Sequence, residues 1–146
     1  MPDDMEIPDI RRRLRHALEQ ARRDSAERRA RADLASTAYT AFLRDIATPV
    51  FRMFASVVKA EGHPFAIATP AGTVRLASER HADDFIEIWL DTSLDPPEVA
   101  TRVSRMRGRD LTTKEGVLRE GAPINGLTDE DVFALLLANI GALVER

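Results

Sequence analysis

Apolar positions along the first fifty residues recur at helical spacing, but their density changes along the way. Residues 9–48 hold no helix breaker, and alanine, arginine, leucine and glutamate, all good helix formers, dominate them. Apolar side chains are sparse up to Ala21, nearly disappear over residues 24–33, and return with larger members from Leu34 onward. We therefore predict a long helix capped by Asp9. Residues 1–33 are interpreted as a projecting charged helix and residues 34–146 as a single α+β globular domain.

Pro49 allows two interpretations of the segment around it. Thr48 followed by Pro49 is typical of an N-cap with proline at the first helical position, which predicts a separate second helix ending near Glu61. One apolar stripe continues through the proline, however, and favours a single helix kinked at Pro49. That stripe consists of Phe42, Ile46, Val50, Met53 and Val57. Gly62 ends the helix in either case.

From Phe65 the apolar period switches to two, which predicts strands. Residues 65–69 and 73–77 flank a Pro-Ala-Gly turn and form a predicted hairpin, and residues 84–91 are the clearest strand. Residues 98–107 fit a helix or a strand. We choose the strand, because Gly108 then turns the chain into a further strand over residues 111–119.

The strand over residues 84–91 has two different faces. Ile86, Ile88 and Leu90 alternate with Phe85, Glu87 and Trp89. If the sheet is covered on one side only, Phe85 and Trp89 are candidates for binding a partner, since tryptophan is a frequent interface anchor. The alternative is that the N-terminal helices cover this face.

The last element is a helix with strong start signals. Thr128 is placed to cap it, and three acidic residues follow at the positive end of the helix dipole. The helix is apolar almost all round, so we expect it to be buried on more than one side. The fold class is therefore α+β: a long N-terminal helix, broken or kinked at Pro49, an antiparallel sheet of four or five strands, and a C-terminal helix.

Charge is unevenly distributed in a chain whose net charge is −3. Nine of the 19 arginines lie in residues 11–31, and Arg11, Arg15, Arg22 and Arg29 share one helix face as a possible anion-binding row. Three acid–arginine pairs at i,i+4 spacing favour a solvated, ion-paired helix instead. They are Glu19 with Arg23, Asp24 with Arg28, and Glu27 with Arg31. Nucleic-acid binding is accordingly the second hypothesis.

Candidate chemistry is scarce. The chain has no cysteine, and its glycines and serines form no phosphate-binding or nucleophile motif. His81, in a polar run ending at Asp84, is interpreted as part of a loop. We predict no catalytic residue, metal or cofactor, and an enzyme with a dispersed site is the third hypothesis. With no signal peptide and no apolar run of about 20 residues, a cytoplasmic protein without a membrane partner is expected.

The leading hypothesis is a non-catalytic interaction or adaptor domain. A helix over residues 9–47 would be about 58 Å long, whereas the rest of the chain forms a body about 35 Å across. The overhanging half carries an apolar side that approximates a short coiled-coil seam and has no evident cover. Its members are Ile7, Ile10, Leu14, Leu18 and Ala21. We therefore predict a homodimer formed through this helix, and binding of another protein.

Overall fold

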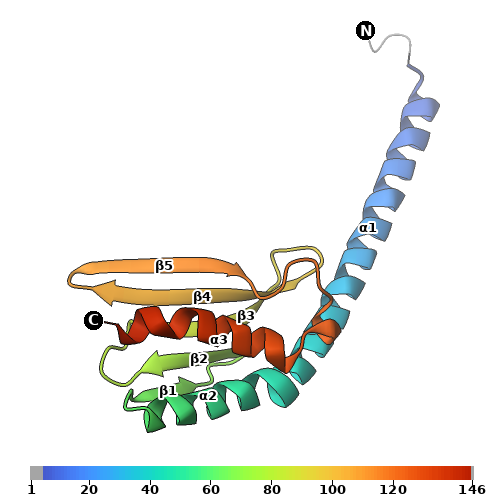
Figure 1. The fold of residues 1–146 in the computed structure, drawn as a ribbon. Coiled ribbons are helices and arrows are strands. Elements are labelled where there is room, and N and C mark those ends of the chain that lie inside the picture. Colours follow the sequence, from blue (N-terminus) through green and yellow to red (C-terminus); the bar gives the residue numbers. More distant parts are fainter. Residues whose placement is uncertain (1–4, 146) are drawn as a thin grey trace.

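The N-terminal helix is the longest element of the protein and extends well beyond the body. The computed structural model describes residues 5–145. Helix α1 spans Ile7–Phe42, a π-helical turn spans Leu43–Ala47, and helix α2 follows over Thr48–Ala60 (Figure 1). The 36 residues of α1 make a rod about 54 Å long. The helix begins after Glu6, so Asp9 lies in its first turn and is not its cap.

The chain stays helical through Pro49. Thr48 has helical angles, φ −61° and ψ −46°, so the predicted cap at Thr48 is wrong and the alternative of one continuous, distorted helix is the observed one. Pro49 cannot donate to the carbonyl of Asp45, four residues earlier. The π-helical turn includes Asp45, and its wider hydrogen-bond pattern accommodates the loss of this bond without ending the helix. Continuous burial of Phe42, Ala47 and Phe51 outweighs the local cap signal.

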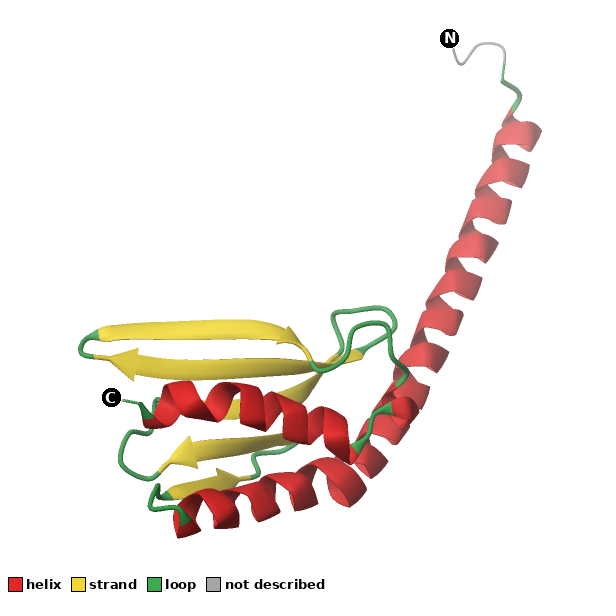
Figure 2. Ribbon diagram, viewed as in Figure 1, coloured by secondary structure: helices red, strands yellow, loops and turns green. Residues whose placement is uncertain are grey.

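Five strands form one antiparallel sheet in which each strand pairs with its neighbours in the chain (Figure 2). They are β1 (Phe65–Ala68), β2 (Thr73–Ser78), β3 (Phe85–Asp91), β4 (Glu98–Arg107) and β5 (Asp110–Val117). The α+β prediction is thereby confirmed, as is the strand over residues 98–107. Ile88 lies opposite Val74 on β2 and Thr101 on β4, which places the apolar side of β3 at the centre of the sheet.

The core lies between one sheet face and the helices α2 and α3. Val74, Leu76, Ile86 and Ile88 are fully buried from the sheet side. Phe51 of α2 and Leu136 of α3 meet them from the helix side and are also fully buried. Tyr39, near the end of α1, donates a hydrogen bond of 2.6 Å to the carbonyl of Gly72 and so fixes α1 against the β1–β2 turn.

Helix α3 (Asp129–Val144) begins with the predicted cap. The backbone N–H of Asp131 donates to Thr128 Oγ1 at 3.3 Å, and the backbone N–H of Thr128 donates to Asp131 Oδ2 at 2.9 Å. The expectation that α3 is buried on more than one side is wrong. Val132, Leu136 and Leu143 are buried, whereas Phe133 and Leu137 are exposed on the outer side. The outer side of α3 is apolar, as the sequence indicated, but no other described part of the body covers it.

The cap at Thr128 gives a prediction on stability. The backbone N–H of Thr128 donates to the Asp131 carboxylate and holds the pKa of that carboxylate below the ordinary value of 3.8. A carboxylate whose pKa is lower in the folded state stabilises the fold at pH values above its ordinary pKa. This contribution is lost as the pH falls through the folded-state pKa. We expect Asp131→Asn to lower the free energy of unfolding by about 1 kcal/mol at pH 7. Urea titration at several pH values should show the difference disappearing below pH 3.8; a difference that stays constant with pH would contradict this origin.

Candidate functional site

The first two-thirds of α1 stand free of the body. From Ile7 to Ala30, only Asp9 and Ser25 are partly buried, and all the other residues are exposed. Helix-forming residues hold this segment in shape, since alanine and arginine are among the best helix formers. The body begins to touch the helix where Ser25 and Ala32 border a hollow closed by the β3–β4 loop. Any function of this segment must therefore come from its own surface.

Four large apolar side chains lie exposed on the free segment. Ile7 is 67% exposed, Leu14 55% and Leu18 50%, and Ile10 is similarly open. With Ala21 they follow one side of the helix at spacings of three and four residues, as the sequence predicted for a self-association surface. We call these five residues the α1 stripe. No described residue of the chain covers them, and that side of the helix continues through Ser25 and Ala32 toward the body.

A row of arginines borders the α1 stripe. Arg11, Arg15, Arg22 and Arg29 are all exposed, and none of them forms an ion pair with another described residue. The three predicted i,i+4 acid–arginine pairs are also absent among the described residues, so that prediction is wrong. Asp9 instead pairs with Arg12 and Arg13. An exposed ion pair is only slightly lower in free energy than the two hydrated side chains. The i,i+4 spacing alone is therefore not enough to form these pairs.

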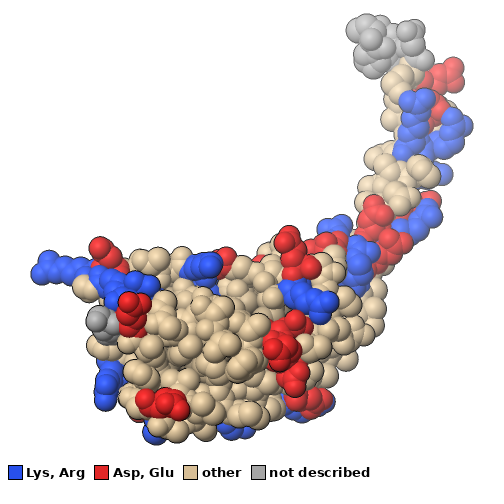
Figure 3. All heavy atoms as spheres, in the orientation of Figure 1, with Lys and Arg blue, Asp and Glu red and all other residues tan. Residues whose placement is uncertain are grey.

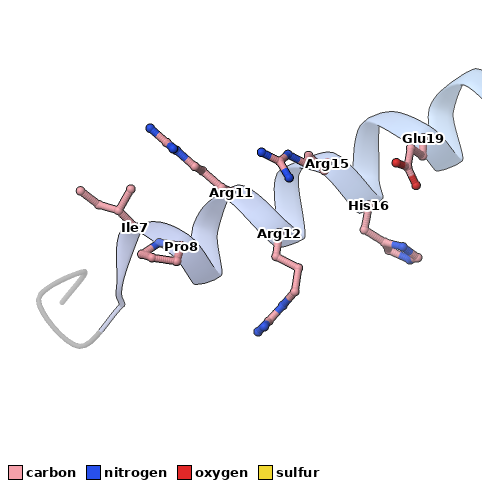
Figure 4. A pocket seen from close by; sticks show the side chains of 7 residues that line it. All are labelled: Ile7, Pro8, Arg11, Arg12, Arg15, His16 and Glu19. Carbon is pink, nitrogen blue, oxygen red and sulfur yellow. The ribbon is translucent and has the colours of Figure 1, made fainter.

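The arginines do not converge on a single point. A shallow hollow of about 570 Å³ lies along the first turns of α1. Figure 4 shows Arg11 and Arg15 on one side of the helix and Arg12 and His16 on the other. Side chains that diverge in this way suit an extended, complementary surface better than a small bound anion.

A second, apolar hollow lies where α1 meets the body, and no sequence pattern indicated it. Arg31 of α1 donates two hydrogen bonds, of 2.8 and 2.9 Å, to the carboxylate of Asp95 in the β3–β4 loop. This contact holds the pKa of Asp95 below its ordinary value. Beside it is an open groove of about 970 Å³, lined chiefly by Leu34, Ala38, Leu94, Pro96 and Ala122. These residues come from three separate segments, so no local pattern links them.

The other sheet face carries Phe85 and Trp89, the predicted partner-binding pair. The helices α2 and α3 cover the opposite face, where Ile86 and Ile88 lie in the core, so the N-terminal helices do not cover these aromatics (Figure 2). Arginine side chains do: the Arg75 guanidinium lies 4.1 Å from the centre of the Phe85 ring, and that of Arg102 lies 4.7 Å from the Trp89 ring. Neither ring is free to anchor a partner without moving an arginine.

Glu87 connects the two arginines across three strands. Its carboxylate accepts from Arg75 Nε at 2.8 Å and from Arg102 Nη1 at 3.0 Å, and Glu115 accepts from Arg102 Nε at 2.9 Å. Glu87 is almost fully buried beneath these guanidinium groups. We call Arg75, Glu87, Arg102 and Glu115 the ladder. Its two positive and two negative charges pair with each other, and we interpret it as a structural cover of the sheet.

The polar run at His81 forms a turn between β2 and β3. Ser78 Oγ accepts from the backbone N–H of His81 at 3.2 Å, and the buried Asp84 carboxylate accepts from the backbone N–H of Met106 at 2.8 Å. Within residues 5–145, no three histidine, aspartate or glutamate side chains gather closely enough to hold a metal ion. No described helix combines the length and apolar character needed to cross a bilayer.

Comparison of the chain with protein-family models, with curated proteins and with solved structures found no match.

Proposed function

We propose that the protein is a non-catalytic interaction domain that self-associates through its N-terminal helix. One observation carries the proposal: the α1 stripe presents four large apolar side chains, each at least 43% exposed, on a helix that stands clear of its own body. Burying a leucine or isoleucine side chain contributes about 1.5–3 kcal/mol, so their shared burial provides a substantial driving force for association.

The described body of the same chain does not reach the α1 stripe. The last turns of α1 are fixed by the buried side chains of Tyr39 and Phe42, and the helix is unbroken from Ile7 to that point. Ala21 is 14 residues before Ala35, where packing on the core becomes regular, and this separation is about 21 Å along a rigid rod. The proposal assigns this cover to a second molecule.

Charge substitutions within the α1 stripe test the proposal. We expect the full chain to sediment as a dimer at tens of micromolar, and the Leu14→Glu/Leu18→Glu variant to sediment as a monomer, because two carboxylates would stand in the apolar surface that the dimer buries. Glutamate is a good helix former, so the circular dichroism of the variant should match that of the natural chain.

His16→Glu/Gln20→Glu is the matched control. It introduces the same two charges at the same four-residue spacing in the same turns, but on the other side of the helix, where both residues are exposed. This control should remain dimeric. A natural chain that sediments as a monomer throughout the concentration range would refute the proposed function.

Nucleic-acid binding is the second candidate, and the unpaired arginine row is the observation that favours it. The logarithm of the binding constant falls with the logarithm of salt concentration, and each arginine that neutralises a phosphate contributes about 0.9 to the steepness of that slope. Retention on duplex DNA near physiological salt, abolished by replacing Arg11, Arg15, Arg22 and Arg29 with glutamine, would place this candidate above self-association.

A further inference from the structure

A second uncovered apolar surface lies on the outer side of the two body helices. Met53 and Val57 of α2 are 67% and 57% exposed, and Phe133 and Leu137 of α3 are 39% and 57% exposed. We call these four residues the α2–α3 face. Figure 3 shows the surface over α2 and α3 as largely uncharged, with charged groups gathered at its margins and along the projecting helix.

The four side chains lie on two helices that contact each other. The rings of Phe54 and Phe133 meet edge to face at 6.0 Å, which marks the line where α2 and α3 touch. Met53 and Val57 are one turn apart on α2, next to Phe54, and Phe133 and Leu137 are one turn apart on α3. Rows of this spacing are the ridges through which helices pack against one another.

The charges of α1 and α3 are complementary. Residues 7–23 contain six arginines against two carboxylates, Asp9 and Glu19, a net charge of +4. Residues 129–145 contain four carboxylates, three in the first turn of α3 and Glu145 just beyond its end, and no lysine or arginine. Arg119 already pairs with Asp131 at 3.5 Å, which leaves Asp129, Glu130 and Glu145 without an ion pair to a described residue. On α2, the Lys59 ammonium lies 3.9 Å from the Glu79 carboxylate, and Arg52, the other cation of this helix, is exposed.

The lengths of the two surfaces also correspond. The α1 stripe covers 14 residue steps from Ile7 to Ala21, about 21 Å, and α3 has 16 residues, about 24 Å. The rigid connection through Tyr39 and Phe42 holds the α1 stripe away from the α2–α3 face of its own chain. Only the face of another molecule is within reach.

Pairing of two α1 helices with each other is less favourable on the same evidence. In an antiparallel pair related by a two-fold axis, equivalent flanks face each other, so the unpaired arginine row would oppose its own copy. In a parallel pair, both bodies would lie at the same end. Because the side that bears the α1 stripe also meets the body at Ala32, each body would occupy the space of the other helix.

We propose that the α1 stripe of one copy docks on the α2–α3 face of a second copy. This inference rests on the proposed function and names its acceptor surface. Reciprocal exchange of helices would bury both apolar surfaces of each chain and close a two-fold dimer. The arginine row would then lie beside the carboxylates of α3.

Disulfide trapping tests this arrangement directly, because the chain has no cysteine. Leu14→Cys and Leu137→Cys variants, carrying tags of different mass, are mixed in equal amounts at tens of micromolar and oxidised. We expect the mixed disulfide to be the main product. Replacing Leu14→Cys by His16→Cys, on the other side of the same turn, should reduce the yield of mixed disulfide at least fivefold.

Sedimentation of a charge variant gives an independent measurement. Leu137→Glu should raise the dimer dissociation constant at least tenfold while the fold is retained, since Leu137 is exposed. Thr113→Glu adds the same charge at an exposed position on β5 and should leave the dissociation constant unchanged.

The outcomes separate the inference from the function on which it rests. A disulfide formed mainly between two Leu14→Cys chains, or a dimer unaffected by Leu137→Glu, would overturn the inference and leave self-association through α1 intact. A disulfide mainly between two Leu137→Cys chains, with a dimer that survives Leu14→Glu/Leu18→Glu, would overturn both. A natural chain that is monomeric would also overturn both.

Discussion

Replacing Leu136 with alanine is expected to lower the free energy of unfolding by about 2–5 kcal/mol. Leu136 has no exposed surface and lies on the inner side of α3, within the core that α3 and α2 form with the sheet. Truncation removes buried methyl groups and leaves a cavity that the surrounding strands cannot fill, because core packing is already close. Chemical denaturation followed by circular dichroism measures the loss.

The neighbouring residue provides the matched control. Leu137 undergoes the same chemical change on the same helix but is mostly exposed, so Leu137→Ala should cost less than about 1 kcal/mol. Both substitutions are best made in the Leu14→Glu/Leu18→Glu background, so that self-association does not contribute to stability. Equal losses for the two variants would show that α3 is not held by its inner side.

Local patterns are sufficient to predict most individual elements. The alternation around Ile86 and Ile88, the Pro-Ala-Gly turn and the capping residue Thr128 each act within a few residues of the chain, and each forms as expected. Residues 98–107 are ambiguous because their period fits two structures. Pairing settles them: Glu87 lies opposite Arg102, a partner that no local window contains.

Interactions between distant segments account for the errors. Thr48 is a good local cap signal, but the core needs Phe42, Ala47 and Phe51 on one continuous side, and the helix runs on. The prediction that α3 is buried on more than one side failed for a related reason. A periodic apolar pattern shows which residues are apolar, but it does not show which other segment covers them. The Arg31–Asp95 contact and the groove beside it join segments more than sixty residues apart.

The α1 stripe and its proposed acceptor surface differ in how far local patterns predict them. Its members can be selected from spacing alone, and the structure leaves them exposed on one side of a free helix. The acceptor surface cannot, because Met53 and Val57 belong to α2 and Leu137 to α3, and these two helices come together only in the folded chain (Figure 1). Charge on α3 is visible in the sequence, but its relation to α1 has meaning only once the overhang of α1 is known.

The second large effect is expected at Glu87. Glu87→Ala should lower the free energy of unfolding by about 3 kcal/mol, because it removes the carboxylate shared by two guanidinium groups and opens a gap beneath them. The Glu87 side chain is 4% exposed, whereas those of Arg75 and Arg102 are 34% and 36% exposed. The two arginines can turn toward water, so the loss should be below that of stranding a fully buried charge.

The protein reports this change through its single tryptophan. The Arg102 guanidinium lies over the Trp89 ring and is held there by Glu87 on one side and by Glu115 on the other. In Glu87→Ala only Glu115 still anchors the guanidinium, and the Trp89 emission of the folded protein should shift to longer wavelength as water reaches the ring. Glu87→Gln keeps the shape and one acceptor oxygen, so it should cost less than the alanine variant.

Glu115→Ala separates the buried contact from the exposed one within the same ladder. Glu115 also accepts from Arg102, but its side chain is 59% exposed, so its removal should cost less than about 1 kcal/mol. If Glu115→Ala and Glu87→Ala destabilise equally, the ladder acts through charge alone and burial of Glu87 contributes nothing. If neither changes the Trp89 emission, the arginine does not hold its place over the ring, and Phe85 and Trp89 return as candidates for binding a partner.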